Sequence, residues 1–91
     1  MSYQFKTVPS FRRALRKLSP HQKSAAKQAF AIFKQNPFDP RLRPHKIHRL
    51  SAAYGVTIYA VCIEGDLRAV FYVEANTVWS VDIGTHAIYR G

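Results

Sequence analysis

The chain has 91 residues, of which 47% are hydrophobic, and its fourteen Lys and Arg against five Asp and Glu give a formal net charge of +9. This length allows one domain, residues 1–91, with a modest core, and the hydrophobic share excludes a disordered chain. The positive charge suits a polyanionic partner, either nucleic acid or an acidic protein segment.

The cysteine count and the first residues bear on the compartment. A single cysteine, Cys62, excludes an internal disulfide and fits a reducing environment. The N-terminal residues lack the apolar run of a signal peptide, and no apolar stretch is long enough to span a bilayer. We therefore expect a cytoplasmic protein.

A strand and a short helix are predicted at the N-terminus. Residues 3–8 alternate in part between apolar and polar side chains, which favours a strand beside the main sheet. Pro9 ends this strand, and Ser10 is suited to the N-cap of a helix that runs from Phe11 to Leu18. The apolar residues of this helix fall at helical spacing.

A longer second helix is predicted from its boundary signals. Ser19-Pro20 places a capping residue and a first-turn proline in sequence, which is a strong helix start. The helix is expected to end near Gln35, because Asn36 precedes Pro37 and the residue before proline avoids helical geometry. The two helices should form a hairpin that covers a sheet.

The rest of the chain predicts strands. Residues 38–50 are irregular, and we interpret them as a loop that leads to a short strand, His45 to Leu50. Three strands rich in Val, Ile, Tyr and Phe should follow as an antiparallel meander, at residues 54–63, 67–73 and 77–83. The predicted fold class is α+β, a two-helix hairpin packed on a four- to five-stranded, mostly antiparallel twisted sheet.

The first turn of the meander predicts a register. A two-residue loop at Gly65-Asp66 pairs Glu64 with Leu67, Ile63 with Arg68, and Tyr59 with Tyr72. The side chains that should then face the helices are all apolar: Val56, Ile58, Ala60, Cys62, Leu67, Ala69, Phe71 and Val73.

The second turn allows two registers. A two-residue loop would place Asp82 in the core, so we favour a three-residue loop, 74–76, with Asn76 in the left-handed conformation. This register directs Trp79, Val81 and Ile83 into the core. The open face of the sheet should then carry Tyr59, Arg68, Val70, Tyr72, Ser80 and Asp82, with Arg68 across from Asp82.

Arg68 and two residues near the C-terminus are candidates for chemistry. A guanidinium on an open sheet face can hold a phosphate with two hydrogen bonds, although Arg68 could instead pair with Asp82. His86 is a candidate because a histidine can donate or accept a proton near neutral pH, as general acid or base, and Tyr89 can stack on a nucleobase. The alternative for both is a surface tail packed on the domain edge.

A run of basic residues precedes the meander. On a strand, Lys46 and His48 share one side, and His45 and Arg49 share the other. This could place a base or phosphate contacts beside Arg68, while the alternative is a solvated basic patch. Since the two histidines lack Cys or acidic partners at metal-ligand spacing, we expect no metal site.

Three segments carry a resemblance to a known family. They are Asn36-Pro37 with the following basic stretch to Leu50, the hairpin Glu64-Gly-Asp-Leu-Arg68-Ala-Val-Phe-Tyr72, and the ending Ile83-Gly84-Thr85-His86-Ala87-Ile88-Tyr89. In this order and at this spacing, over nearly the full length, the chain resembles RelE/ParE-type toxins of bacterial type II toxin–antitoxin systems.

The resemblance implies an activity and partners. It implies an endoribonuclease without metal or cofactor that cleaves mRNA, often at the ribosome, and that forms a hetero-oligomer with a neutralising antitoxin. By position, Arg68 would stabilise the scissile phosphate, His86 would be the general acid or base, and Tyr89 would contact the nucleotide. His48 and Lys46 would complete the catalytic set. The implied RNA or phosphate contacts are His45, Arg49, Arg43, Arg41, Asp66 and Arg90.

One departure from the family pattern leaves alternatives open. Several nucleases of the family carry basic residues or a histidine on the strand before the hairpin turn, whereas residues 56–63 have none here. The chain could therefore resemble the ParE-like branch, which inhibits DNA gyrase without catalysis. It could also be an inactive member that binds only the antitoxin.

Overall fold

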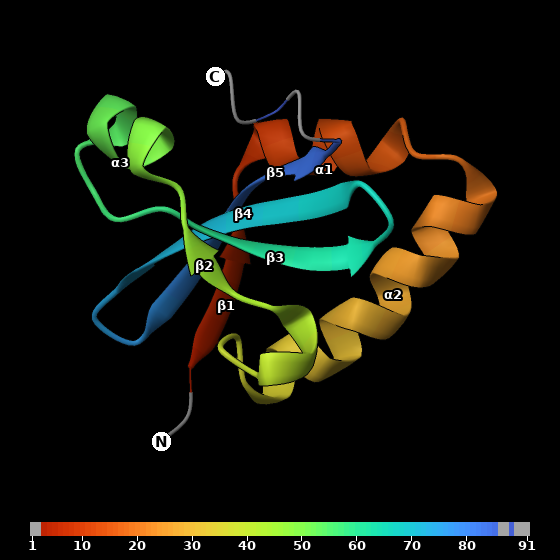
Figure 1. Cartoon of the computed structure of the whole chain (residues 1–91), viewed down its shortest axis with the longest axis horizontal. Coiled ribbons are helices and arrows are strands. Elements are labelled where there is room, and N and C mark those ends of the chain that lie inside the picture. The colour runs from red at the N-terminus through yellow and green to blue at the C-terminus, as the bar shows by residue number, and fades with distance from the viewer. Residues whose placement is uncertain (1–2, 86–87, 89–91) are drawn as a thin grey trace.

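A five-stranded sheet forms the centre of the protein, shown as a computed structural model that describes residues 3–85 and 88 (Figure 1). The strands lie in the order β1-β5-β4-β3-β2. β1 and β5 are parallel, and the other neighbours are antiparallel. This confirms the predicted α+β fold class with a mostly antiparallel sheet. The strands are β1 Gln4–Thr7, β2 His45–Lys46, β3 Tyr59–Glu64, β4 Leu67–Glu74 and β5 Thr77–Gly84.

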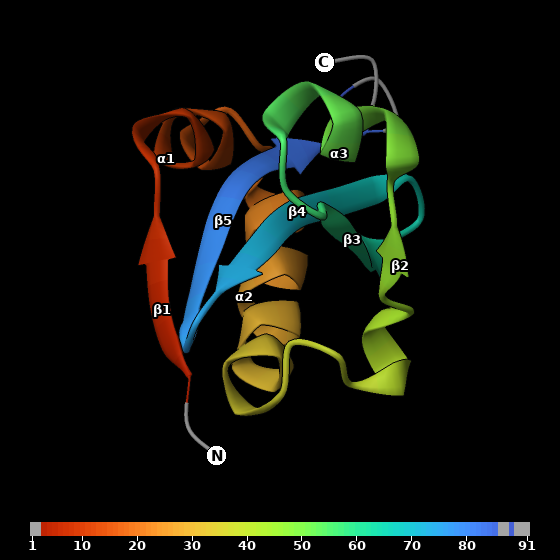
Figure 2. The same ribbon diagram turned by 90° about the vertical axis from the view of Figure 1, so that its left-hand side faces the viewer.

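Helices lie against both faces of the sheet. In Figure 2, α2 lies behind the sheet, while α3 lies in front of its upper part. Each face accordingly has its own core: Phe33 of α2 packs with Phe71 on one side, and Leu50 of α3 packs with Val70 on the other. The helical segments are α1 Pro9–Arg16, α2 Pro20–Gln35, the 3-10 helix η1 Pro40–Leu42, and α3 His48–Tyr54. In the described part of the chain, no helix is both long and apolar enough to cross a membrane.

The boundaries of α2 confirm the prediction. The Ser19 hydroxyl accepts a hydrogen bond from the Gln22 backbone N–H at 3.1 Å, and the Gln22 side chain accepts one from the Ser19 N–H at 3.0 Å. This reciprocal capping box satisfies two N–H groups at the helix start, a contribution of about 1 kcal/mol. The helix ends at Gln35, immediately before Asn36-Pro37.

The predicted start of α1 is wrong by two residues. The N-cap is Val8, and Pro9 is the first helical residue, since its fixed φ suits a first turn. Ser10 therefore lies inside the helix, and its hydroxyl donates to the Val81 carbonyl at 2.9 Å. This bond fastens α1 to β5.

The predicted strand over 45–50 is also wrong beyond Lys46, and so is a strand that begins at Tyr54. The chain turns into α3, in which the Ser51 hydroxyl donates to the Ile47 carbonyl and accepts from the Ile58 N–H. Gly55 ends the helix with a φ of 73°, and its backbone N–H donates to the Ser51 carbonyl. The two hydroxyl bonds join the start of α3 to the chain that enters β3.

The hairpin of β3 and β4 has the predicted two-residue turn, but its register changes next to the turn. Glu64 pairs with Leu67, whereas Cys62 pairs with Arg68, so Ile63 is an extra residue. The predicted pairs Ile63–Arg68 and Tyr59–Tyr72 are therefore wrong. As a consequence Tyr59 and Val61 lie with the α2-side core. Ala60 and Ile58 lie in the core under α3. Val56 is exposed and belongs to neither core.

The second turn has two residues and not three. Glu74 pairs with Thr77, and Ala75, with a φ of 54°, takes the left-handed conformation that we predicted for Asn76. Farther along the two strands the register shifts by one residue. Phe71 pairs with Ser80 and Val70 pairs with Asp82, so Val81 is an extra residue.

This bulge separates the residues that were predicted to share the core. Val81 is the extra residue and packs under α3, whereas Ile83 packs in the α2-side core as predicted. Trp79 pairs with Tyr72 and belongs to neither core cluster, so its predicted core position is wrong. The bulge also keeps Asp82 on the side of Val70 and out of the α2-side core, although the turn is short.

Candidate functional site

The face of the sheet that carries α3 also carries Arg68, and we call it the open face. Cross-strand partners share a face, so the register places Cys62, Arg68 and Gly84 in one row across β3, β4 and β5. The next row is His45, Ala60, Val70 and Asp82. α3 covers part of this second row, because Leu50 packs on Ala60 and Val70.

Arg68 is held by the backbone of its own hairpin. Its side chain is half-buried, and Nη1 donates to the Gly65 carbonyl at 2.7 Å and to the Leu67 carbonyl at 3.3 Å. The expected position across from Asp82 is wrong, since Arg68 pairs with Gly84, and no ion pair joins the two side chains among the described residues. The guanidinium is thus held by neutral backbone carbonyls.

Gly84 allows Ile88 to approach the Arg68 row. A Cβ at this position would lie 2.8 Å from Cγ2 of Ile88, which is closer than real Cβ atoms come. Ile88 packs on the core under α3, and its N–H donates to the Thr85 carbonyl at 3.0 Å. The predicted residues His86, Tyr89 and Arg90 belong to this segment but lie outside the described residues.

His45 is the one residue of the basic run that the register places on the face of Arg68. It pairs with Ala60 on edge strand β2, two strands away from Arg68. Strand spacing and rise put the two Cα atoms roughly 12 Å apart. His45 Nδ1 lies 2.9 Å from the Arg43 carbonyl. Because a carbonyl only accepts, Nδ1 carries the proton in this bond, and in the neutral ring Nε2 has the lone pair that a base needs.

The other members of the basic run surround this edge. Lys46 pairs with Tyr59, whose ring packs on Phe38 and Phe71 on the α2 side, so Lys46 lies on the face opposite Arg68. His48 and Arg49 begin α3 and are exposed. The predicted two-sided strand pattern is therefore broken by the helix.

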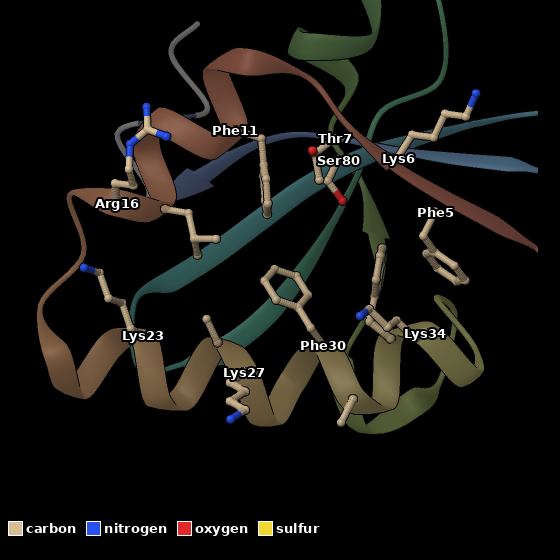
Figure 3. A pocket seen from close by; sticks show the side chains of 14 residues that line it. Phe5, Lys6, Thr7, Phe11, Arg16, Lys23, Lys27, Phe30, Lys34 and Ser80 are labelled. Atoms are coloured by element: carbon tan, nitrogen blue, oxygen red, sulfur yellow. The ribbon is translucent and has the colours of Figure 1, made fainter.

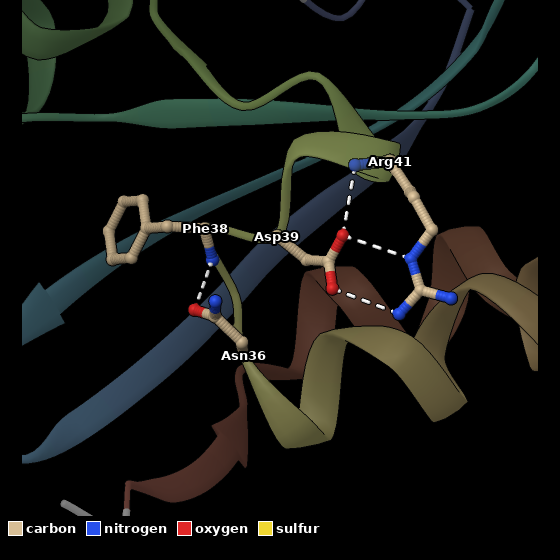
Figure 4. Close-up of polar contacts among 4 residues, drawn as sticks. All are labelled: Asn36, Phe38, Asp39 and Arg41. Carbon is tan, nitrogen blue, oxygen red and sulfur yellow. Dashed lines mark hydrogen bonds and ion pairs between the residues drawn. The ribbon is translucent and has the colours of Figure 1, made fainter.

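Arg41 is already engaged by an acid (Figure 4). Its Nε donates to Asp39 Oδ1 at 3.1 Å and its Nη2 to Oδ2 at 2.9 Å. The side-chain hydrogen bond with Arg41 lowers the pKa of Asp39, and the same bond raises the pKa of Arg41. A phosphate would have to displace Asp39 to bind here. The remaining predicted contacts, Arg43 and Asp66, are exposed.

Asp82 lies on the open face and was not among the site residues predicted from the sequence. It is half-buried, and burial raises the pKa of its carboxyl, although a hydrogen bond from the Ile83 N–H to Oδ1 at 2.8 Å opposes this effect. It lies one row from Arg68. The sequence signal was its expected place on the open face, where we considered it only as a partner of Arg68.

A groove lies on the opposite side of the molecule, between β1, α1 and α2 (Figure 3). Its volume is about 900 Å³, and its floor is apolar, with Phe5, Phe11 and Phe30. None of the described residues that line it is acidic. The basic residues of α1 and α2 that line it are Arg16, Lys23, Lys27 and Lys34, and Lys6 of β1 borders it with its side chain directed away from the groove (Figure 3).

No metal centre is evident in the part of the chain that the structure describes. Within residues 3–85 and 88, no three side chains of His, Cys, Asp or Glu come together as metal ligands would.

Several solved structures share this fold. A chain of the archaeal RelE–RelB complex from Pyrococcus horikoshii OT3 matches with a TM-score of 0.69 and 15% identity over 93% of this chain and 96% of that chain. A chain of the toxin–antitoxin complex RelBE2 from Mycobacterium tuberculosis matches with 0.70 and 19% over 94% and 100%. YafQ from E. coli matches with 0.74 and 13% over 99% and 100%.

These likenesses show that the chain has the fold of RelE-type toxins, as the sequence resemblance implied. At such low identity they establish the fold and not the activity. No family model matches the sequence. No match was found among curated proteins either.

The shifted pKa of Asp82 predicts how stability depends on pH. A carboxyl whose pKa is raised by folding destabilises the folded state as the pH rises above about 4, the ordinary aspartate value. Asp82→Asn should therefore increase the free energy of unfolding at pH 7, by less than about 1 kcal/mol, and should have no such effect at pH 3. Urea unfolding at both pH values measures this.

The matched control is Asp39→Asn, for which the sign reverses. Arg41 lowers the pKa of Asp39, so this carboxylate stabilises the folded state at neutral pH and loses that contribution in acid. Asp39→Asn should then reduce stability at pH 7 more than at pH 3. A loss of stability at pH 7 in Asp82→Asn would contradict the account and would indicate that a cation neutralises Asp82.

Proposed function

We propose that this protein, which has the fold of RelE-type toxins, is the toxin of a toxin–antitoxin pair. Its activity is that of a metal-independent endoribonuclease that cleaves mRNA at the ribosome and inhibits translation in the cytoplasm. The observation that carries the proposal is the state of Arg68. Its guanidinium lies on the open face, is oriented by two backbone carbonyls, and has no acidic partner among the described residues.

The chemistry needs a cation and two proton-transfer groups. The 2′-oxygen of a ribose attacks the adjacent phosphorus, the P–O2′ bond forms, and the P–O5′ bond breaks. A base removes the 2′-hydroxyl proton, and an acid protonates the departing 5′-oxygen, which leaves a cyclic phosphate and a 5′-hydroxyl. Arg68 stabilises the negative charge that develops on the phosphate oxygens.

We assign the proton-transfer roles to two histidines. His86 is the general acid or base, and Tyr89 contacts the nucleotide, as the family resemblance implies. His45 is a second candidate for the base, because it shares the open face with Arg68 and its Nδ1–H donates to the Arg43 carbonyl, which orients the ring. His48 and Arg49 contribute positive charge or hydrogen bonds at the edge where the RNA enters.

The second part of the proposal is a protein partner, an antitoxin that forms a hetero-oligomer with this chain. Residues 1–38 contain eight Lys and Arg and no Asp or Glu. Four of these cations lie in α1 and α2 around the apolar groove. An acidic segment with one apolar face is complementary to this surface in both charge and hydrophobicity. Chains of the RelE–RelB and RelBE2 complexes share the fold, which supports such a partner.

Replacement of Arg68 tests the nuclease. Arg68→Ala should reduce mRNA cleavage about 10²–10³-fold, because the charge on the phosphate loses its main stabilising group. Arg68→Lys keeps the charge without the paired donors and should retain part of the activity. Primer extension on mRNA after induction of each variant measures cleavage, and thermal unfolding shows whether each variant is folded.

Arg13→Ala is the matched control, since Arg13 is exposed on α1 and is not one of the residues that we assign to the nuclease site. It should cleave like the unaltered chain. Intact mRNA in growth-arrested cells that express the unaltered chain would contradict the nuclease and favour gyrase inhibition. Intact mRNA in cells that grow normally would favour an inactive, antitoxin-binding protein.

Charge reversal in the groove tests the partner surface. The double variant Lys27→Glu/Lys34→Glu should weaken binding of the cognate antitoxin by about tenfold or more, because two attractive contacts become repulsive. The control Arg13→Glu/Lys17→Glu changes the net charge equally on the exposed side of α1. Surface plasmon resonance with immobilised antitoxin measures both, and equal affinity of the two double variants would exclude the groove as the binding surface.

A further inference from the structure

The open face carries a third row of residues, beyond the rows of Arg68 and Val70, that the proposed nuclease site does not include. Lys6 pairs with Trp79, and Trp79 pairs with Tyr72, so the three lie side by side across β1, β5 and β4. Tyr72 and Val70 alternate with Phe71 along β4, which places this row on the same face as Arg68. Figure 2 shows that α3 lies over the upper part of this face only, and no helix lies in front of the lower parts of β1, β5 and β4.

The three side chains form a stack. The rings of Tyr72 and Trp79 are 6.4 Å apart with an interplanar angle of 20°, and Nζ of Lys6 lies 5.4 Å from the centre of the Trp79 ring. Figure 3 shows the Lys6 side chain directed away from α2, on the side opposite Phe5. Trp79 is half-buried and contributes to neither core, so packing of the core does not require an indole here.

A stack of this kind has the properties of a nucleotide subsite. Aromatic rings on the exposed face of a sheet bind single-stranded RNA by stacking on its bases, and a nearby cation binds the phosphates. Lys6 is exposed and flexible, so a base can replace it on the Trp79 ring while its ammonium group moves to the adjacent phosphate. This exchange keeps both the ring and the ammonium group in contact with a partner.

The position fits an RNA strand that also reaches Arg68. Tyr72 follows Arg68 by four residues along β4, a separation of roughly 13 Å, which a few unstacked nucleotides cover. Beyond it the next row contains Glu74, paired with Thr77, and this acid marks the end of the surface suited to a polyanion.

We infer that Trp79, with Tyr72 and Lys6, forms a base-stacking subsite that holds the RNA a few nucleotides from the phosphate at Arg68. The inference rests on the proposed ribonuclease function. Trp79 is a positioning residue, because its row is separated from that of Arg68, and it acts on RNA binding more than on the rate of cleavage.

Trp79 is the single tryptophan of the chain, so its fluorescence reports on the subsite directly. We expect an eight-nucleotide oligouridylate to quench the emission with a saturable dependence on concentration. An abasic ribose-phosphate oligomer of equal length should bind through its charge and leave the emission nearly unchanged. Emission that is unaffected while the oligouridylate binds, as measured by anisotropy of a labelled strand, would overturn the inference.

Substitution separates the subsite from the activity. Trp79→Leu should weaken oligouridylate binding on the order of tenfold, and Trp79→Phe should retain most of the affinity. The control Tyr54→Leu removes an aromatic side chain that is 49% exposed on α3 and should bind like the unaltered chain. If Trp79→Leu does not fold, Trp79→Phe and the fluorescence titration still decide the question.

The outcomes distinguish this inference from the function on which it rests. RNA that is bound and mRNA that is cleaved equally well by Trp79→Leu would overturn the subsite and leave the nuclease in place. Absence of both RNA binding and mRNA cleavage in the unaltered chain would overturn both. Quenching by an acidic peptide but not by RNA would overturn the subsite and identify this surface as a protein interface.

Discussion

The register of β4 against its two neighbours determines which side chains share a face of the sheet. Each pairing contains one extra residue, Ile63 on β3 and Val81 on β5. Because side chains alternate along a strand, a shift of one residue moves a whole segment to the other face. The bulges thus place apolar side chains on both faces, under α2 and under α3. The bulge on β5 also keeps Asp82 on the face without α2, one row from Arg68, so this part of the candidate site depends on it.

The sequence predicts most where the signals are local. Ser19-Pro20 and Asn36-Pro37 define α2 through backbone geometry alone, and the Gly65-Asp66 turn was predicted correctly for the same reason. The bulges arise from competition between packing on the two faces, which no short segment encodes. The helix α3 was missed because residues 45–50 were interpreted as one strand. Its signal was Gly55 after Leu50-Ser-Ala-Ala-Tyr54, a run with three good helix formers before a C-terminal glycine.

The candidate site was predicted in its residues more than in its arrangement. Arg68 on an open face followed from alternation along β4, but no pattern in the sequence predicted its support by the Gly65 and Leu67 carbonyls. Residues 56–63 lack the basic residue or histidine that several nucleases of the family carry on this strand, but a histidine from another strand lies close to it. The edge strand β2 places His45 beside β3, on the same face as Arg68. The two sides of the molecule thereby differ in chemistry, with a polar open face on one side and an apolar groove with a basic rim on the other.

In the function that we propose, RNA binds on the open face of the sheet. Chemical-shift mapping of the ¹⁵N-labelled chain with a 2′-O-methyl oligonucleotide, which lacks the attacking hydroxyl and cannot be cleaved, tests this claim most directly. We predict the largest shifts at Arg68, Tyr72, Trp79 and Gly84, with the groove residues Lys27 and Phe30 unchanged. Shifts confined to α1 and α2 would contradict the account, because RNA would then bind the surface that we assign to the protein partner.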